Sequence, residues 1–140
     1  AVLQKVNLLG FLQTQNGLQT ELLEKAGNLS GGQCQRLVIA RALLRSDSAV
    51  YIFDEAASNI DVESEELIMN VIHELAKTKT VLLISHRLAN VVQSDQIYFL
   101  KNGTICERGT HAELMEQNGA YRHLYDSQMV LENYGKEGNA

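Results

Sequence analysis

The sequence contains no proline and no tryptophan, and it has no long run of apolar residues. Its longest apolar runs, 49–53 and 81–84, fall far short of the roughly 18 residues that a membrane-spanning helix needs. No basic segment followed by an apolar block marks a secretory signal at the N-terminus. Without a low-complexity linker or an internal repeat, the 140 residues have the size of one ordinary domain, and an apolar content of 45% is enough for a core.

Metal-binding and disulfide patterns are also lacking. The two cysteines, Cys34 and Cys106, are far apart and neither belongs to a C-x-x-C pair, so reduced thiols in the cytosol are expected. The four histidines form no H-x-x-x-H or H-E-x-x-H pattern, which argues against a zinc site. A net charge of −5 argues against a nucleic-acid partner.

Helical and strand patterns alternate along most of the chain. Helices are expected over 1–13, after Ser30, over 62–77, after Thr110 and from Ala120, strands over 49–53 and 80–84, and mostly loop over 14–29. The strand at 49–53 is continuously apolar, which predicts a strand covered on both faces. This order of elements predicts an α/β layered sheet whose central strands are mostly parallel.

Local signals mark where several of these elements begin or turn. Ser30 with Gln33 and Thr110 with Glu113 have the spacing of capping boxes, and Asp61 is expected to cap the helix at 62–77. Between 96 and 109 apolar and polar residues alternate around an Asn-Gly pair at 102–103, which predicts a β-hairpin.

Reactive side chains follow both predicted parallel strands. Asp54 and Glu55 come directly after the first strand, and Ser85 and His86 after the second. Ligands of open α/β sheets bind beyond the carboxyl ends of the strands, and adjacent carboxylates there suit a magnesium–phosphate site. The alternative is that Asp54 and Glu55 are simply the first polar residues after a strand. Taken by itself, His86 is expected to be a buried neutral histidine.

The two glycines of the Ser-Gly-Gly-Gln stretch lie at a predicted helix N-terminus. Such a terminus has unpaired amides and a positive dipole end, and glycines let an anion approach the backbone. An ordinary capping box with a loop glycine explains Ser30 and Gln33 but not Gly31 and Gly32. An anion site at 30–33 is therefore predicted.

The order of five short motifs resembles the nucleotide-binding domain of ABC-type ATPases. These motifs are LSGGQ (29–33), QRLVIARAL (35–43), VYIFDEA (50–56), SNID (58–61) and SHRL (85–88), and the resemblance covers about residues 1–126. The segment that begins with SHRL is similar to the exporter branch of the family. The implied fold class is α/β, a partial P-loop NTPase-like layered sheet with part of the helical signature subdomain. Residues 1–45 would belong to that subdomain, 46–132 to the ATPase core and 133–140 to a disordered tail.

The resemblance implies a signature loop made of Leu29, Ser30, Gly31, Gly32 and Gln33. Its serine and glycine amides would contact the γ-phosphate of an ATP molecule held by the opposite domain of a dimer. ATP and Mg²⁺ are therefore the implied cofactors, and a second nucleotide-binding domain is the implied partner.

The remaining motifs supply the other implied roles. Asp54 would hold Mg²⁺ through its water shell, Glu55 would polarise the hydrolytic water, and His86 would touch the γ-phosphate. The loop 58–61 would reach across the dimer; it departs from the commoner Ser-Ala-Leu-Asp but keeps Asp61.

A phosphate-binding P-loop, G-x-x-x-x-G-K-[ST], is missing from the sequence. The chain is therefore expected to be the C-terminal part of the domain of a longer exporter with transmembrane segments, at the cytoplasmic face of the membrane. By itself it is expected to be soluble and inactive, and to self-associate through an incompletely covered sheet. The alternatives are a non-catalytic donor of the signature loop and a piece of a soluble ABC ATPase, and the exported substrate stays open.

Overall fold

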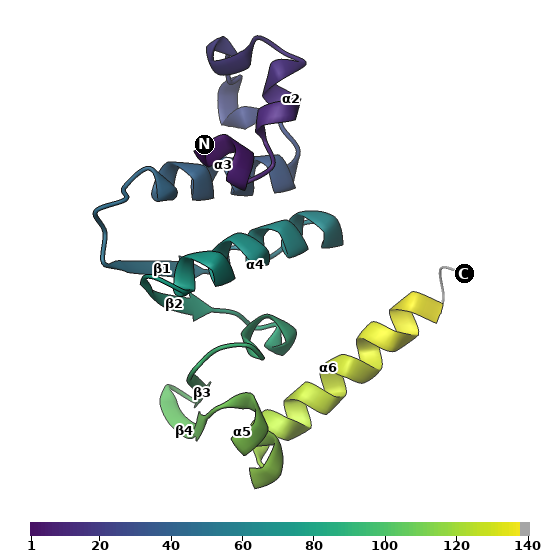
Figure 1. Cartoon of the computed structure of the whole chain (residues 1–140). Helices are drawn as coiled ribbons and strands as arrows, with labels where there is room; N and C mark the ends of the chain where they lie inside the picture. Colours follow the sequence, from purple (N-terminus) through teal and green to yellow (C-terminus); the bar gives the residue numbers. More distant parts are fainter. Residues whose placement is uncertain (138–140) are drawn as a thin grey trace. The chain divides into compact units, whose positions relative to one another are not determined.

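The computed structural model describes the backbone of residues 1–137 and the side chains of residues 1–132 (Figure 1). The chain divides into two compact units, Ala1–Ile84 and Ser85–Ala140, and each unit is described by itself. Among the residues described, no helix is both long enough and apolar enough to cross a membrane.

The first unit contains helices and one parallel strand pair. Its elements are α1 (Val2–Lys5), α2 (Leu9–Gln13), the 3₁₀ turns η1 (Gly17–Gln19) and η2 (Glu24–Ala26), α3 (Gly31–Leu43), β1 (Val50–Asp54), α4 (Val62–Ala76) and β2 (Thr80–Ile84). The strands β1 and β2 pair in parallel from Val50 opposite Thr80 to Asp54 opposite Ile84, and α4 connects them. The predicted α/β class and the parallel pairing are confirmed.

The single helix predicted over 1–13 is wrong, because the chain breaks between α1 and α2. Asn7 has a φ of 51°, and the amide of Leu8 donates to the carbonyl oxygen of Leu3 at 2.8 Å. Val6 and Leu8 are both buried in the core of the unit. A continuous helix would place residues two apart on different faces, so the break allows both side chains to reach the core.

The prediction that the first strand is covered on both faces is also wrong. Tyr51 and Phe53 are buried, and they pack in the same core as Ile68 and Ile72 of α4. The alternate side chains of β1 are exposed, and Ile52 retains 65% of its accessible surface. The unit therefore covers one face of its two-stranded sheet and leaves an apolar face, formed by Val50, Ile52, Leu82 and Ile84, exposed to solvent. The expectation of an incompletely covered sheet is confirmed.

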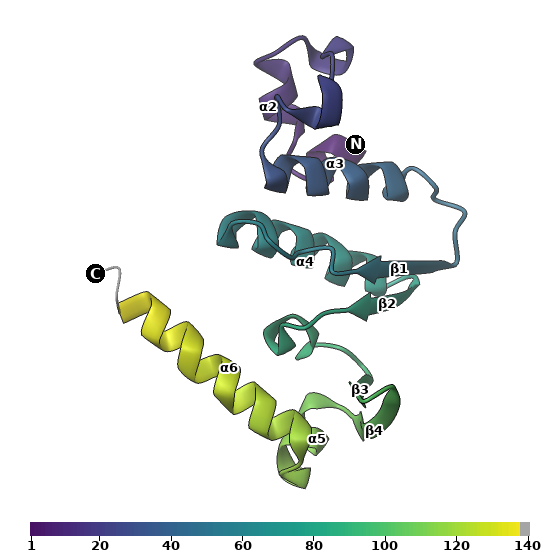
Figure 2. The ribbon, with the colours of Figure 1, turned by 180° about the vertical axis from the view of Figure 1, so that it is seen from behind.

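The second unit contains a 3₁₀ turn, a hairpin and the helices α5 and α6 (Figure 2). Its elements are η3 (Leu88–Val91), β3 (Ile97–Lys101), β4 (Thr104–Gly109), α5 (His111–Gln117) and α6 (Ala120–Glu137). The strands are antiparallel, and the turn residues Asn102 and Gly103 have φ values of 51° and 77°, as the predicted two-residue hairpin requires. Leu88, Ile97, Leu114 and Tyr121 form the core of this unit.

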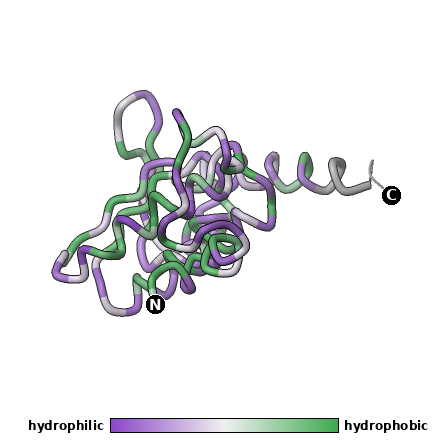
Figure 3. Tube along the Cα trace, turned by 90° about the horizontal axis from the view of Figure 1, so that it is seen from above, coloured by the Kyte–Doolittle hydropathy of each residue, from purple (hydrophilic) through white to green (hydrophobic). Residues whose placement is uncertain are grey.

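A carboxylate from β4 caps the N-terminus of α6, and the sequence analysis did not predict this cap. The side chain of Glu107, on β4, accepts hydrogen bonds from the amides of Ala120 at 2.5 Å and Tyr121 at 3.1 Å. A Cβ atom on Gly119 would lie 2.5 Å from a carboxylate oxygen of Glu107, so the glycine leaves room for this cap. Hydrophobic and hydrophilic segments follow one another along the part of α6 that carries the hydropathy colours in Figure 3.

The helix α6 continues to Glu137, into the segment that the sequence predicts as a disordered tail. The last part of that predicted tail, 138–140, lies outside the described residues.

Candidate functional site

The predicted signature loop lies at the N-terminus of α3, and its capping box is confirmed. The hydroxyl oxygen of Ser30 accepts from the amide of Gln33 at 3.2 Å, and the Gln33 side chain accepts from the amide of Ser30 at 2.9 Å. Within the residues that the structure describes, the amides of Gly31 and Gly32 donate to no acceptor. The first turn of α3 thus keeps two backbone donors at the positive end of a helix of 13 residues.

The two glycines have different surroundings. A Cβ atom on Gly31 would meet nothing within 4 Å, whereas one on Gly32 would lie 2.2 Å from the hydroxyl oxygen of Ser64, a buried residue in the first turn of α4. Close packing of the two helices therefore accounts for Gly32. Gly32 thus has a packing reason in addition to the predicted anion, whereas Gly31 has none, and the anion site itself stays a prediction.

Asp61 lies beside this helix contact. Its carboxylate accepts from the amide of Ser64 at 2.8 Å and thereby caps α4, as predicted. Hydrogen bonds from the amide and hydroxyl of Ser64, supported by the charge of Arg36, hold the pKa of Asp61 below its usual range. The structure therefore brings the predicted signature loop and Asp61 together at the N-termini of α3 and α4.

The lowered pKa of Asp61 predicts an acid-dependent loss of stability. Because the folded chain holds the carboxyl deprotonated more strongly than the unfolded chain does, the contribution is fully present above about pH 4 and is lost as the pH falls through the folded pKa. In Asp61→Asn the amide still caps α4 but does not titrate. Urea unfolding of both proteins between about pH 2 and about pH 7 should show the advantage of aspartate over asparagine shrinking toward acid pH. Parallel stability curves would contradict the prediction.

Asp54 and Glu55 lie where β1 ends, and the chain turns sharply there. Glu55 has a φ of 51°, a left-handed conformation that is uncommon for a residue other than glycine, while its amide donates to the carbonyl of Ile84 at 3.0 Å. The amide and hydroxyl of Ser58 both donate to the carbonyl of Glu55, at 3.1 and 2.8 Å, and these bonds maintain the turn. Strained residues of this kind occur preferentially at functional sites.

The side chain of Asp54 is exposed and that of Glu55 is half-buried. No three histidine, cysteine, aspartate or glutamate side chains gather into a metal-binding group among the described residues. Mg²⁺ is commonly held by one or two carboxylates together with waters and the phosphates of a substrate. Asp54 at the end of β1 and Glu55 directly after it fit that kind of ion.

The carboxyl ends of β1 and β2 point to the same end of the first unit at which α3 and α4 begin (Figures 1 and 2). In chain order that end carries the signature loop, Asp54, Glu55 and Asp61. This arrangement agrees with the rule that ligands of α/β sheets bind beyond the carboxyl ends of the strands.

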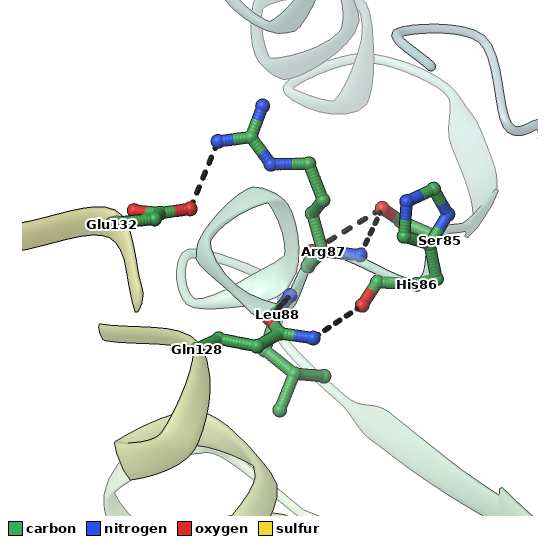
Figure 4. Close-up of polar contacts among 6 residues, drawn as sticks. All are labelled: Ser85, His86, Arg87, Leu88, Gln128 and Glu132. Carbon is green, nitrogen blue, oxygen red and sulfur yellow. Dashed lines mark hydrogen bonds and ion pairs between the residues drawn. The ribbon is translucent and has the colours of Figure 1, made fainter. Parts of the chain in front are cut away.

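His86 belongs to the second unit, and its side chain is exposed. The interpretation of His86 as a buried histidine is therefore wrong. Its backbone carbonyl accepts from the side-chain amide of Gln128 on α6 at 2.7 Å, as Figure 4 shows. Sequence reasoning missed Gln128, and only its position one helical turn before Glu132 on an amphipathic helix could have drawn attention to it.

Comparisons with known proteins agree with the resemblance to the nucleotide-binding domain of ABC-type ATPases. The family model of the ABC transporter family matches residues 2–58. An ABC transporter ATP-binding protein of Haemophilus influenzae is 51% identical over 140 residues, which are 100% of this chain and 25% of that protein. An ATP-dependent lipid A-core flippase of Mannheimia succiniciproducens is 53% identical over 114 residues, 81% of this chain and 19% of that protein.

A solved structure of a bacterial Atm1-family ABC exporter with ATP bound superimposes with a TM-score of 0.80 and 31% identity, covering 91% of this chain and 22% of that one. The chain belongs to the ABC transporter family. Within this family it is an exporter-type segment of the nucleotide-binding domain, and it spans a quarter or less of the length of the relatives it matches.

Proposed function

We propose that this chain is the C-terminal part of the ATP-hydrolysing domain of a membrane exporter, and that it donates its signature loop to an ATP molecule bound by a second domain. One observation carries the proposal: the capping box of α3 pairs the amides of Ser30 and Gln33, while those of Gly31 and Gly32 keep no acceptor among the described residues. Leu29 precedes this cap and completes the loop. Backbone amides at a helix N-terminus are suited to a phosphate.

The other candidate residues complete the proposed reaction. Asp54 would hold Mg²⁺ through water, and its exposed carboxylate at the end of β1 fits that role. Glu55 orients and polarises the attacking water, Asp61 contributes from the loop that faces the partner domain, and His86 contacts the γ-phosphate. Mg²⁺ when bound neutralises charge that develops on the phosphates.

Substitution of Gly31 tests the proposal, because a side chain at this position can affect phosphate binding without disturbing the packing of the fold. A side chain at this position meets no neighbour, so Gly31→Ala and Gly31→Asp should both fold. Aspartate at the start of a helix is favourable for the helix but repels a phosphate. We expect Gly31→Asp to lower ATP turnover of the full-length exporter by about 100-fold or more, and Gly31→Ala to change it much less. Equal turnover of the two variants, with equal melting temperatures, would overturn the proposal.

The isolated 140-residue chain is expected neither to hold ATP tightly nor to hydrolyse it. A P-loop provides most of the grip on the β- and γ-phosphates, and this sequence contains none. The exposed apolar side chains of Val50, Ile52, Leu82 and Ile84, together with unpaired strand edges, favour self-association of the chain. A monodisperse monomer in light scattering, with a sharp cooperative melt, is the result that contradicts this expectation.

The whole exporter would be an integral membrane protein with this segment at its cytoplasmic face, where transmembrane domains and a second nucleotide-binding domain are its partners. A second candidate function is that the chain acts only as a donor of the signature loop. The preformed capping box of α3 favours it, since the loop geometry is complete within the first unit. Adding the chain to an isolated P-loop domain separates the two, because a pure donor raises ATP turnover even when it carries Glu55→Gln.

A further inference from the structure

Side chains of the helix α6 form hydrogen bonds and an ion pair with the loop that carries His86. The carbonyl oxygen of the Gln128 side chain accepts from the amide of Leu88 at 2.9 Å, and its amide nitrogen donates to the carbonyl of His86 at 2.7 Å. One carboxamide thus bridges the two residues on either side of Arg87 (Figure 4). Only a group with a donor and an acceptor side by side can satisfy both backbone positions.

Two further contacts hold the same loop. The Ser85 hydroxyl accepts from the amide of Arg87 at 3.1 Å and donates to its carbonyl at 3.2 Å. The Arg87 guanidinium pairs with the carboxylate of Glu132 at 2.9 Å. Since Gln128 and Glu132 are four residues apart on α6, they lie on one face of that helix.

Leu88 anchors the far side of the loop because it is buried in the core of the second unit. The backbone at His86 is therefore held between a buried side chain and two side chains of α6, while the imidazole itself remains exposed. A fixed backbone at His86 limits the positions that its ring can reach.

We propose that Gln128 is a positioning residue for ATP turnover, which fixes the backbone of His86 so that its ring is presented correctly to the nucleotide. The proposal rests on the function proposed above for His86. Positioning errors of about 1 Å can cost on the order of 100-fold in rate, so fastening of this loop bears directly on turnover. Through Gln128 and Glu132, α6 takes part in the reaction without touching the substrate.

The test measures kcat and KM for ATP in the full-length exporter. Gln128→Met keeps the length of the side chain but removes both hydrogen bonds, and it is expected to lower kcat by about 10-fold or more with little change in KM. Gln128→Glu keeps the acceptor for Leu88 but places an oxygen against the His86 carbonyl, and the same direction is expected. Asp126→Asn is the control, since it removes only the exposed pair of Asp126 with Arg122 on the same helix.

A double-mutant cycle with His86→Ala distinguishes positioning from a merely structural role. If Gln128 acts through His86, Gln128→Met should have no further effect on kcat once His86→Ala is present. Equal losses in both backgrounds would overturn the inference, as would normal kcat in both Gln128 variants. If His86→Ala leaves turnover intact, the proposed function of His86 fails and the inference fails with it. Should Gln128→Met not fold, Gln128→Glu at matched melting temperature carries the same comparison.

Discussion

Glu55→Gln in the full-length exporter is expected to lower ATP turnover by about 100- to 10,000-fold. Glutamine has the shape of glutamate but cannot accept a proton or carry the charge that polarises a water molecule. The backbone bonds at this turn, from Ser58 to the Glu55 carbonyl and from the Glu55 amide to Ile84, do not involve the side chain. Thermal unfolding of the variant, measured beside its turnover, distinguishes a loss of chemistry from a loss of folding.

The left-handed backbone conformation of Glu55 leads to a second prediction at the same position, which concerns the free energy of unfolding. With a φ of 51°, glutamate is strained there and glycine is not. Glu55→Gly should therefore raise the free energy of unfolding by about 1 kcal/mol while turnover is lost. A gain in stability with loss of activity would mean that the strain is retained for function. If Glu55→Gln retains normal turnover, the carboxylate has no role in hydrolysis.

The parts of the fold that the sequence predicted correctly depend on local signals. The capping boxes at Ser30 and Thr110, the Asp61 cap and the Asn102–Gly103 turn each involve residues within three positions of one another. The interactions among such residues are the same wherever the segment lies in a protein. The parallel pairing of β1 and β2 was also predictable, because an intervening helix of 15 residues permits a parallel crossover.

The features that the sequence did not reveal depend on contacts between distant residues. The break at Asn7 reflects the need to bury both Val6 and Leu8 against the core. The carboxylate of Glu107 caps a helix that begins 13 positions later, and no spacing rule connects the two. The apolar run at 49–53 alone predicted a strand covered on both faces, whereas the missing P-loop part predicted the incompletely covered sheet that the structure shows.

In the candidate site, too, the features that depend on local signals were predictable from the sequence, and those that depend on distant contacts were not. The motifs themselves could be recognised from the sequence, and so could the capping of α3 and α4. The sequence could not show that Gly32 lies against Ser64, 32 positions further along the chain, or that Gln128 reaches the loop of His86. Both contacts join segments that only the fold brings together.

Gly32→Ala is expected to destabilise the chain by about 1–3 kcal/mol, although alanine is normally the better helix former. The added Cβ would lie 2.2 Å from the hydroxyl oxygen of Ser64 and 2.6 Å from its Cβ, which is closer than such atoms approach. Ser64 is buried in the first turn of α4, so the two helices must move apart. Urea unfolding of the variant and the parent chain measures the difference.

Gly31→Ala is the matched control, because it makes the same chemical change one residue earlier in open space. It should leave the free energy of unfolding unchanged or raise it by up to about 1 kcal/mol. Ser64→Gly removes the two atoms that lie closest to the new Cβ, so Gly32→Ala should cost less in that background than in the parent. Equal destabilisation by Gly31→Ala and Gly32→Ala, or no relief from Ser64→Gly, would mean that helix contact does not account for glycine at position 32.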